Sequence, residues 1–335
     1  MCEEWLNNGL KYKIKINNFE TDMERKIRCF FNTNSSFRNF CFMKSLPNLK
    51  TSQRIIKNNI VNKSSFASIR FGLYEYMLCY QYLEKKCGIR KKYSDFIRYH
   101  ISMDAGIFNC DDNSLDKYSN YVISNLDIVD VISYWRDIPN NSVFRHFYNP
   151  NMQQINVDYL YPYPFLHKGE LPNWQLLLRD KNVLVVSAFS KTIKQQYEKR
   201  NILWNNSDHI LPSFNLITYE AIRTNAGQTD PRFKSWEEAL NYMEEEILQY
   251  DFDIALISCG AYGMPLAMKL KKKKCKAIQW GGCFQLWFGI LGGRWNKDSR
   301  ILKYVNSAWT YPLKEETPPL ANLINNSCYW KPDEN

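Results

Sequence analysis

The second half of the chain carries the most regular pattern of apolar and polar positions. Four apolar runs of strand length alternate with stretches in which apolar residues recur at helical spacing. The predicted strands cover residues 182–187, part of 214–222, 254–257 and 276–280, and the predicted helices cover 191–199, the residues from 235 onward and those from 264 onward. This alternation predicts an α/β fold that is Rossmann-like, with a mostly parallel sheet and helices on both faces.

The first half repeats the pattern less clearly. Residues 65–71 alternate well enough for a strand, Gly72 ends it, and residues 73–86 follow with helical spacing. Further helices are predicted at 52–62 and 114–127, a strand at 128–134 and a loop at 104–108. In residues 235–238, Ser235 and Glu238 form a capping box that starts a helix.

These patterns divide the chain into four parts. Residues 1–50 form an irregular lead-in with one strand at 11–16, and residues 51–180 form an N-terminal α/β part. Residues 136–173 within that part show no strong periodicity and are interpreted as a long connection. Residues 181–313 form a Rossmann-like, nucleotide-binding half, and residues 314–335 form a weakly ordered tail.

Glycine is concentrated at the ends of the last two predicted strands. Seven of the thirteen glycines lie between Gly260 and Gly293. Parallel strands end at one edge of a sheet, where ligands bind, and glycine lets a phosphate approach the backbone. The predicted nucleotide contacts are therefore Gly260, Ala261, Tyr262, Gly263, Gly281 and Gly282. The alternative is that these glycines only permit tight turns. Neither a Gly-x-Gly-x-x-Gly nor a P-loop pattern is present.

Other polar residues are expected at the same edge. Ser187, Phe189 and Ser190 follow the strand at 182–187 and face a helix N-terminus, although Ser190 has the alternative role of a helix cap. Arg294 follows Gly292 and Gly293, and it either neutralises a diphosphate or stacks on Trp295.

The early strand-to-helix turn carries the best candidates for catalysis. Arg70 is the only charge in its apolar strand, and Glu75 lies just beyond Gly72. A buried charge needs a partner or a ligand. Arg70 and Glu75 therefore either form a buried pair or line the crevice, where Glu75 serves as general base or metal ligand.

The net charge of the chain limits the classes of binding partner that we expect. The 335 residues carry a net charge of +10, which suits a nucleotide, a membrane surface or nucleic acid. No nucleic-acid module is recognisable, so no nucleic-acid partner is expected. The lysines at 269 and 271–274 form either a solvated helix end or a membrane-surface patch.

The ten cysteines show no Cys-x-x-Cys spacing, the four histidines show no metal-like spacing, and no signal peptide or spanning segment is apparent. The expected location is cytoplasmic, including the periphery of the inner face of the membrane.

Several motifs together resemble a widespread set of uncharacterised bacterial proteins that often come from surface-polysaccharide regions. These motifs are Ser-Ile-Arg-Phe-Gly-Leu-Tyr-Glu (68–75), Asp-Ala-Gly-Ile-Phe (104–108), Val-Leu-Val-Val-Ser-Ala-Phe-Ser-Lys-Thr-Ile (183–193), Cys-Gly-Ala-Tyr-Gly-Met-Pro-Leu-Ala (259–267), Gln-Trp-Gly-Gly-Cys-Phe-Gln-Leu-Trp-Phe-Gly-Ile (279–290) and Gly-Gly-Arg-Trp (292–295). More distantly, the layout is similar to that of GT-D-type glycosyltransferases, which carry an Arg-x-Gly-Asp-Gly-Glu element after an early strand.

The resemblance implies an enzyme that transfers sugar from a nucleotide-diphosphate donor to a glycan or lipid-linked glycan, in capsule or O-antigen biosynthesis. It also implies a divalent ion, Mn²⁺ or Mg²⁺, at an Asp-x-Glu motif. Glu75 matches the Glu of that motif, but Leu73 stands where the Asp is expected, so metal dependence stays open. Two alternatives are a non-catalytic component of a polysaccharide assembly complex, and another glycan-modifying or nucleotide-hydrolysing enzyme on the same scaffold.

Overall fold

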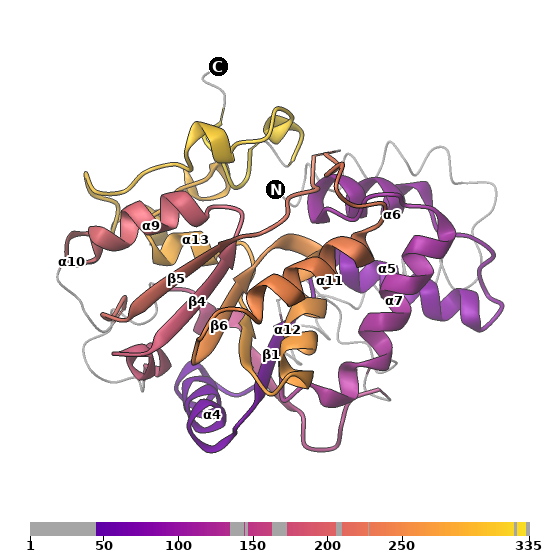
Figure 1. The fold of residues 1–335 in the computed structure, drawn as a ribbon, viewed down its shortest axis with the longest axis horizontal. Helices are drawn as coiled ribbons and strands as arrows, with labels where there is room; N and C mark the ends of the chain where they lie inside the picture. Colours follow the sequence, from indigo (N-terminus) through magenta and orange to yellow (C-terminus); the bar gives the residue numbers. More distant parts are fainter. Residues whose placement is uncertain are drawn as a thin grey trace. The chain divides into compact units, whose positions relative to one another are not determined.

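The fold is built on one parallel sheet. A computed structural model describes residues 45–134, 144, 147–162, 173–205, 210–226, 228–324 and 327–332. Within these residues seven strands pair in the order β3-β2-β1-β7-β6-β4-β5, and all neighbours are parallel (Figure 1). They are β1 (Phe66–Arg70), β2 (Val131–Tyr134), β3 (Gln153–Asn156), β4 (Asn182–Ser187), β5 (Asn215–Glu220), β6 (Ile254–Ser258) and β7 (Lys276–Gln279). The predicted α/β class with a parallel sheet is confirmed.

Helices cover both faces of this sheet (Figure 1). On one face α12 (Gly263–Lys272) packs on β1 and β7, with α11 (Trp236–Ile247) and α7 (Asp112–Ser124) beside it. On the other face α4 (Leu49–Asn62), α9 (Ser190–Glu198) and α13 (Phe284–Trp287) share one apolar cluster with alternate strand residues such as Val183 and Val185. Because successive strand residues point to opposite faces, a strand between two helical layers must be apolar throughout.

The remaining helices are short, apart from α5 (Leu73–Lys86), which packs on α7. They are α6 (Asp95–His100), the π-helix η2 (Ile101–Ala105), α10 (Arg200–Leu203) and α14 (Ser299–Leu302), together with 3₁₀ turns at Leu126–Ile128, Val157–Leu160, Trp174–Leu178, Gly260–Tyr262, Gly293–Trp295, Lys314–Glu316 and Ala321–Leu323.

Most predicted elements are confirmed to within a few residues. The helix predicted at 73–86 has the bounds of α5, and Gly72 is its N-cap. The oxygen of Ser235 accepts the backbone N–H of Glu238 at 3.2 Å, as a capping box requires, although the Glu238 carboxylate returns to the N–H of Lys234. The pairing of β1 with β7 joins the N-terminal α/β part and the Rossmann-like half in one sheet.

Three local predictions are wrong. Residues 104–108 are not simply a loop, because η2 extends to Ala105 before Gly106 ends it. The connection predicted at 136–173 contains β3, a polar edge strand that buries only Ile155. Ser190 does not cap α9: Phe189 is the N-cap, and no side chain caps the helix from that position. The strand predicted at 11–16 lies outside the described residues.

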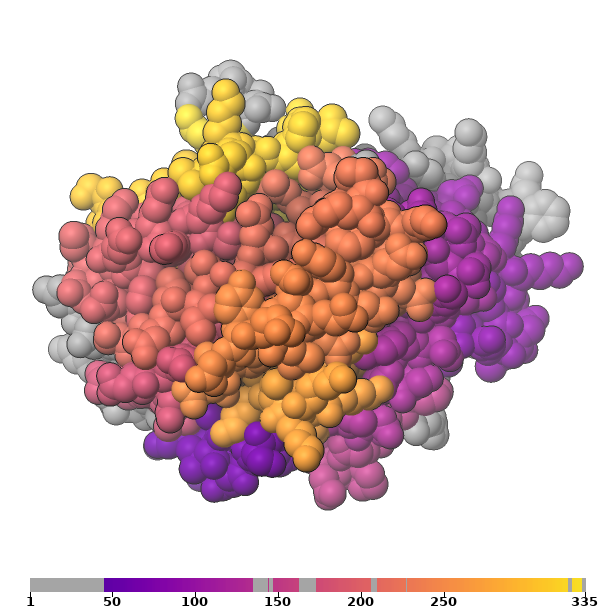
Figure 2. Space-filling model, viewed as in Figure 1, coloured from indigo at the N-terminus to yellow at the C-terminus, as the bar shows by residue number. Residues whose placement is uncertain are grey.

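The prediction of a weakly ordered tail is also wrong for residues 314–324 and 327–332. Glu316 and Trp330 are 1% and 2% exposed, and the Trp330 indole donates to the Glu316 carbonyl oxygen at 3.0 Å. Cys328 accepts a backbone hydrogen bond from Arg294 through its carbonyl. The yellow C-terminal segment lies along one rim of the sheet beside α9 (Figures 1 and 2). Its apolar anchors and buried carboxylate hold it there.

Candidate functional site

Arg70 is held between the carboxyl ends of β1 and β7. It is the last residue of β1, and its backbone N–H donates to the Gln279 side-chain oxygen at 2.6 Å. Its Nε donates to the carbonyl oxygen of Trp280 at 3.2 Å, and Nη1 donates to that of Phe71 at 3.3 Å. The guanidinium therefore lies at the sheet edge with its orientation fixed by main-chain oxygens.

The second glycine turn packs directly against this guanidinium. Gly281 has φ of +87°, and a Cβ at this position would overlap the Nε and Nη2 of Arg70. The Ser258 hydroxyl donates to the Gly281 carbonyl at 3.0 Å, which ties the turn to the end of β6. The predicted proximity of Arg70 and Gly281 is thus present in the structure, and glycine is required there both for its backbone angle and for its missing side chain.

We expect Gly281→Ala to be more damaging than Gly88→Ala. Both glycines have positive φ, but a Cβ at Gly88 (φ of +72°) would meet nothing within 4 Å. Gly88→Ala should therefore cost only about 1–2 kcal/mol of backbone strain. Gly281→Ala adds the displacement of Arg70, so urea unfolding should show a larger loss. Equal losses in the two variants would contradict the packing described here.

Glu75 lies in the first turn of α5, where its carboxylate folds back onto Gly72. A Cβ on Gly72 would overlap the carboxylate, and Glu75 is only 9% exposed. Burial raises the pKa of the Glu75 carboxyl; the charge of Arg70 and a backbone hydrogen bond oppose this, and the charge of Asp104 adds to it. Glu75 is therefore a buried carboxyl with increased proton affinity beside an arginine.

The raised pKa of Glu75 predicts how the stability of the protein changes with pH. A carboxyl whose pKa is higher in the folded than in the unfolded protein stabilises the fold below its unfolded pKa, and that contribution is lost as pH rises through the folded pKa. Glu75→Gln, which cannot ionise, should therefore gain thermal stability relative to wild type as pH increases from about 4.5 to 8. Melting curves over this range test it, with the exposed Glu245→Gln as control. A difference that is constant with pH would contradict it.

The first glycine turn is largely closed by packing. Gly260 is exposed, but a Cβ there would lie 2.5 Å from the carbonyl oxygen of Ala105. Ala261 and Tyr262 are 2% and 3% exposed, and the Tyr262 hydroxyl bonds the hydroxyl of Thr224 at 2.9 Å. Gly263 lets α12 approach the side chain of Gln279. Gly260 is therefore the residue of this turn that a ligand reaches most easily.

The turn after β4 is engaged by the chain itself. The Glu316 carboxylate accepts the N–H of Lys191 at 2.8 Å, and it accepts the N–H and hydroxyl of Thr192. These N–H groups at the start of α9 have no partner within the helix, and a phosphate was expected to bind near them. Ser187 and Ser190 are buried, and the Ser187 oxygen accepts the N–H of Phe189 at 3.1 Å.

Arg294 reaches the same edge from the segment after α13. Its guanidinium lies 4.8 Å from the ring centre of Tyr329 and 5.9 Å from that of Trp295, so the stacking alternative is present, with Tyr329 as the nearer ring. Burial raises the pKa of the Tyr329 hydroxyl, and the charges of Arg294 and Arg70 act against that rise. The same tyrosine ring occupies the space over Gly282. Both arginines thus lie within electrostatic range of Tyr329.

The donor atoms do not fit the divalent ion that the resemblance implies. Among the described residues, no three His, Cys, Asp or Glu side chains gather as metal ligands. Glu75 is buried next to Arg70, and Leu73 supplies no oxygen. Positive charge at this edge comes instead from the two arginines.

Four residues at the edge were not identified from the sequence as site candidates: Asp104, His100, Tyr329 and Glu316. Asp104 belongs to the quoted 104–108 motif, which was a usable signal. His100 is separated from it by one helical turn and showed no metal-like spacing. Tyr329 and Glu316 belong to the predicted tail, and no local pattern connects them to β4 or β7.

Two comparisons with known proteins find no match, and a third finds structural similarity. No protein-family model matches the chain, and no curated protein matches it. A solved structure described as the selenomethionine-substituted domain of unknown function 1792 is similar with a TM-score of 0.40 and 15% identity, over 80% of this chain and 91% of the other. A second, described as showing that this domain "has a distinct glycosyltransferase fold", gives 0.41 and 15%, over 83% and 96%.

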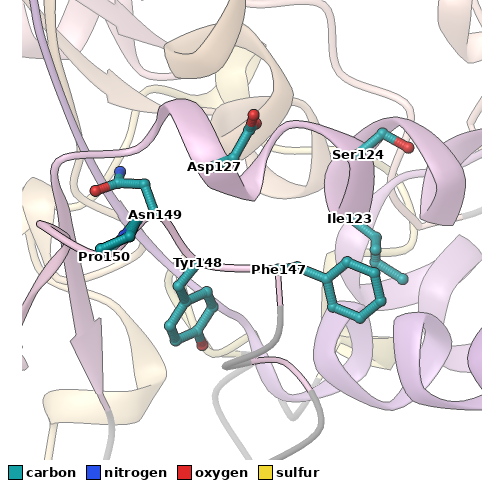
Figure 3. A pocket seen from close by; sticks show the side chains of 7 residues that line it. All are labelled: Ile123, Ser124, Asp127, Phe147, Tyr148, Asn149 and Pro150. Carbon is teal, nitrogen blue, oxygen red and sulfur yellow. The ribbon is translucent and has the colours of Figure 1, made fainter.

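A separate pocket of about 520 Å³ lies beside β2 (Figure 3). It is lined by Ile123, Ser124, Asp127, Phe147, Tyr148, Asn149 and Pro150. Asn149 donates to the carbonyl of Val129, just before β2, which places one end of the pocket near the amino ends of the strands. The Tyr148 hydroxyl bonds that of Tyr134, at the other end of β2, at 2.8 Å, so the pocket runs along this strand. Asp127, an exposed residue before β2, is a suitable place for a control substitution.

The lysine run lies away from the site, at the end of α12. Lys269 pairs with Glu244 at 2.6 Å, and Lys271 pairs with Asp130 at 2.6 Å. Part of the run therefore has partners within the chain. None of the helices in the described part of the chain combines the length and apolar character needed to cross a membrane.

Proposed function

We propose that this chain is a glycosyltransferase that uses a nucleotide-diphosphate sugar to extend or decorate a bacterial surface glycan, such as capsule or O-antigen. One observation carries the proposal. Two arginines, Arg70 and Arg294, approach the carboxyl edge of a parallel sheet beside the glycine turn at Gly281 and Gly282. A doubly wound fold binds its ligand at this edge, and paired guanidinium groups suit a diphosphate.

The chemistry follows from where charge develops. When the sugar leaves its donor, the diphosphate gains negative charge on the oxygen released from the sugar carbon. Fixed positive groups aimed at that oxygen stabilise the transition state more than the ground state. The Arg70 guanidinium is oriented by hydrogen bonds to two main-chain oxygens, so it needs little reorganisation to do this. In this proposal Glu75, whose pKa is raised by burial, donates a hydrogen bond to the departing phosphate.

The proposed donor contacts are Arg70, Arg294, Gly72, Gly260 and Gly281. Gly282 would join them only if the Tyr329 ring moved from the space over it. Ala261, Tyr262 and Gly263 belong to the glycine turn after β6 and support Gly260 from its buried side. Ser187, Phe189 and Ser190 would join the site only if the Glu316 carboxylate moved away from α9. The proposed acceptor is a glycan or lipid-linked glycan.

Thermal shift with nucleotides tests donor binding. UDP, GDP, ADP and dTDP should be compared with the corresponding monophosphates. A diphosphate present at ten times its Kd adds about 1.4 kcal/mol of stability, which corresponds to a shift of roughly 2 °C. The matching monophosphate should shift less, because it offers the arginines fewer charges. If no diphosphate raises the Tm, the donor site is wrong.

The variant that tests catalysis is Glu75→Ala, and the control is Asp127→Asn, at an exposed residue before β2. Glu75→Ala should remain folded and keep the nucleotide shift, but release of nucleotide from the sugar donor should fall strongly. Normal release by Glu75→Ala would remove Glu75 from the catalytic site.

A non-catalytic role in a polysaccharide assembly complex is supported by a different observation. Glu316 already occupies the helix N-terminus that would receive a phosphate. In that case a nucleotide would bind weakly or not at all, and no nucleotide sugar would be turned over by wild-type protein.

A further inference from the structure

We infer that Asp104 and His100 form the acid–base pair that takes the proton from the acceptor hydroxyl, an inference that rests on the glycosyltransferase function proposed above. His100 Nδ1 lies 2.5 Å from Asp104 Oδ2. The side chains are 22% and 11% exposed, so they are restrained but can still be reached by a substrate.

The backbone brings the pair to the catalytic edge. Asp104 lies in the π-helix η2, which ends at Gly106 with φ of +91°. The carbonyl of Ala105 covers Gly260, and the carbonyl of Gly106 accepts the hydroxyl of Thr224. Gly260 and Thr224 follow the carboxyl ends of β6 and β5, so η2 lies over the edge where the donor is proposed to bind. Single π turns of this kind occur frequently at functional sites.

The charges around the pair connect it to the rest of the site. Asp104 acts electrostatically on the Glu75 carboxyl and on the Cys328 thiol. The His100 ring is stacked on Tyr74, the residue before Glu75, with ring centres 4.4 Å apart and planes 10° apart. Phe96 and Tyr99 contact the same ring. His100 is therefore held in one orientation and bonds an aspartate whose charge acts on Glu75.

The hydrogen bond also decides which nitrogen can act. The Nδ1–H donates to the Asp104 carboxylate, so Nε2 of the neutral imidazole carries the free electron pair. In the proposed step, the acceptor O–H gives its proton to Nε2 while its oxygen forms a bond to the anomeric carbon of the sugar. The bond from that carbon to the diphosphate oxygen breaks, and the electron pair leaves with the diphosphate toward Arg70 and Arg294. Asp104 is a positioning residue that fixes the tautomer and stabilises the imidazolium.

The experiment measures release of nucleoside diphosphate to water from whichever nucleotide sugar gives the largest thermal shift. The variants are His100→Ala, His100→Gln and Asp104→Asn, with Asp95→Asn as control because Asp95 is an exposed aspartate on the same helix. Loss of a general base should lower kcat by about 100-fold. Free imidazole should restore His100→Ala at least tenfold but should not restore Asp104→Asn. All variants should keep the thermal shift with the donor.

Different outcomes test the His100–Asp104 pair (the dyad) and the proposed transferase function separately. If wild type releases nucleotide and Glu75→Ala does not, but His100→Ala and His100→Gln release it normally, the dyad is wrong and the transferase stands. A loss of release that imidazole does not restore, together with a lost donor shift, would show a structural role for His100 and overturn the dyad. Wild-type protein with neither shift nor release overturns both. If His100→Ala does not fold, His100→Gln must show the loss of kcat with an unchanged donor shift.

Discussion

Replacing Arg70 with alanine is expected to lower kcat for sugar transfer by about 10²–10³-fold, which corresponds to roughly 3–4 kcal/mol of lost transition-state stabilisation. The size follows from the fixed position of the guanidinium, which main-chain oxygens hold against Gly281 at the edge of the sheet. A preorganised positive group loses little energy to reorientation when the leaving diphosphate gains charge. Its removal therefore has a larger effect on kcat than on donor binding.

Two companion variants make this measurement specific. Arg70→Lys keeps the charge but loses the planar fork, so it should recover only part of the rate. Arg54→Ala removes an exposed arginine from α4 and should leave kcat unchanged. Thermal melting should show Arg70→Ala folded. An unchanged kcat in folded Arg70→Ala would remove Arg70 from the mechanism, whatever the nucleotide shift shows.

Buried strands and helices were predictable from the sequence, because their apolar residues recur at the spacing of a strand or a helix. The strand at β4 is apolar because helices cover both of its faces, and α5 shows a full helical spacing with Gly72 before it. β3 was missed because it is an outer strand with one buried residue, so it lacks the apolar run that marks a central strand. η2 was missed because a π-helix is rare and this one, of five residues, is too short to show a period in the sequence.

The site was partly predictable for a topological reason. Parallel strands end on one edge, so a charge ending one strand and a glycine turn ending its neighbour must meet, as Arg70 and Gly281 do. The contributions of Tyr329 and Glu316 were not predictable in this way. They reach the edge through a C-terminal segment whose described residues form only short 3₁₀ turns, and their partners at Gly282 and Thr192 are distant in sequence.

Glu316→Ala is expected to lower the free energy of unfolding by about 3 kcal/mol. The carboxylate is 1% exposed and accepts hydrogen bonds from the Lys191 N–H and from the N–H and hydroxyl of Thr192. Truncation leaves these donors buried at the positive end of α9, and unsatisfied buried donors cost about 1–3 kcal/mol each before water or the structure relaxes around them. Urea unfolding at neutral pH measures the change.

Glu315→Ala is the matched control because the two glutamates are neighbours with opposite environments. The Glu315 carboxylate pairs with the Lys191 ammonium at 2.8 Å, but both side chains are more than half exposed. An exposed pair contributes about 0–1 kcal/mol. The two variants should therefore differ by about 2 kcal/mol or more, since the difference in burial and donor number is large. Similar losses in Glu315→Ala and Glu316→Ala would mean that the carboxylate at the start of α9 does not hold the C-terminal segment in place.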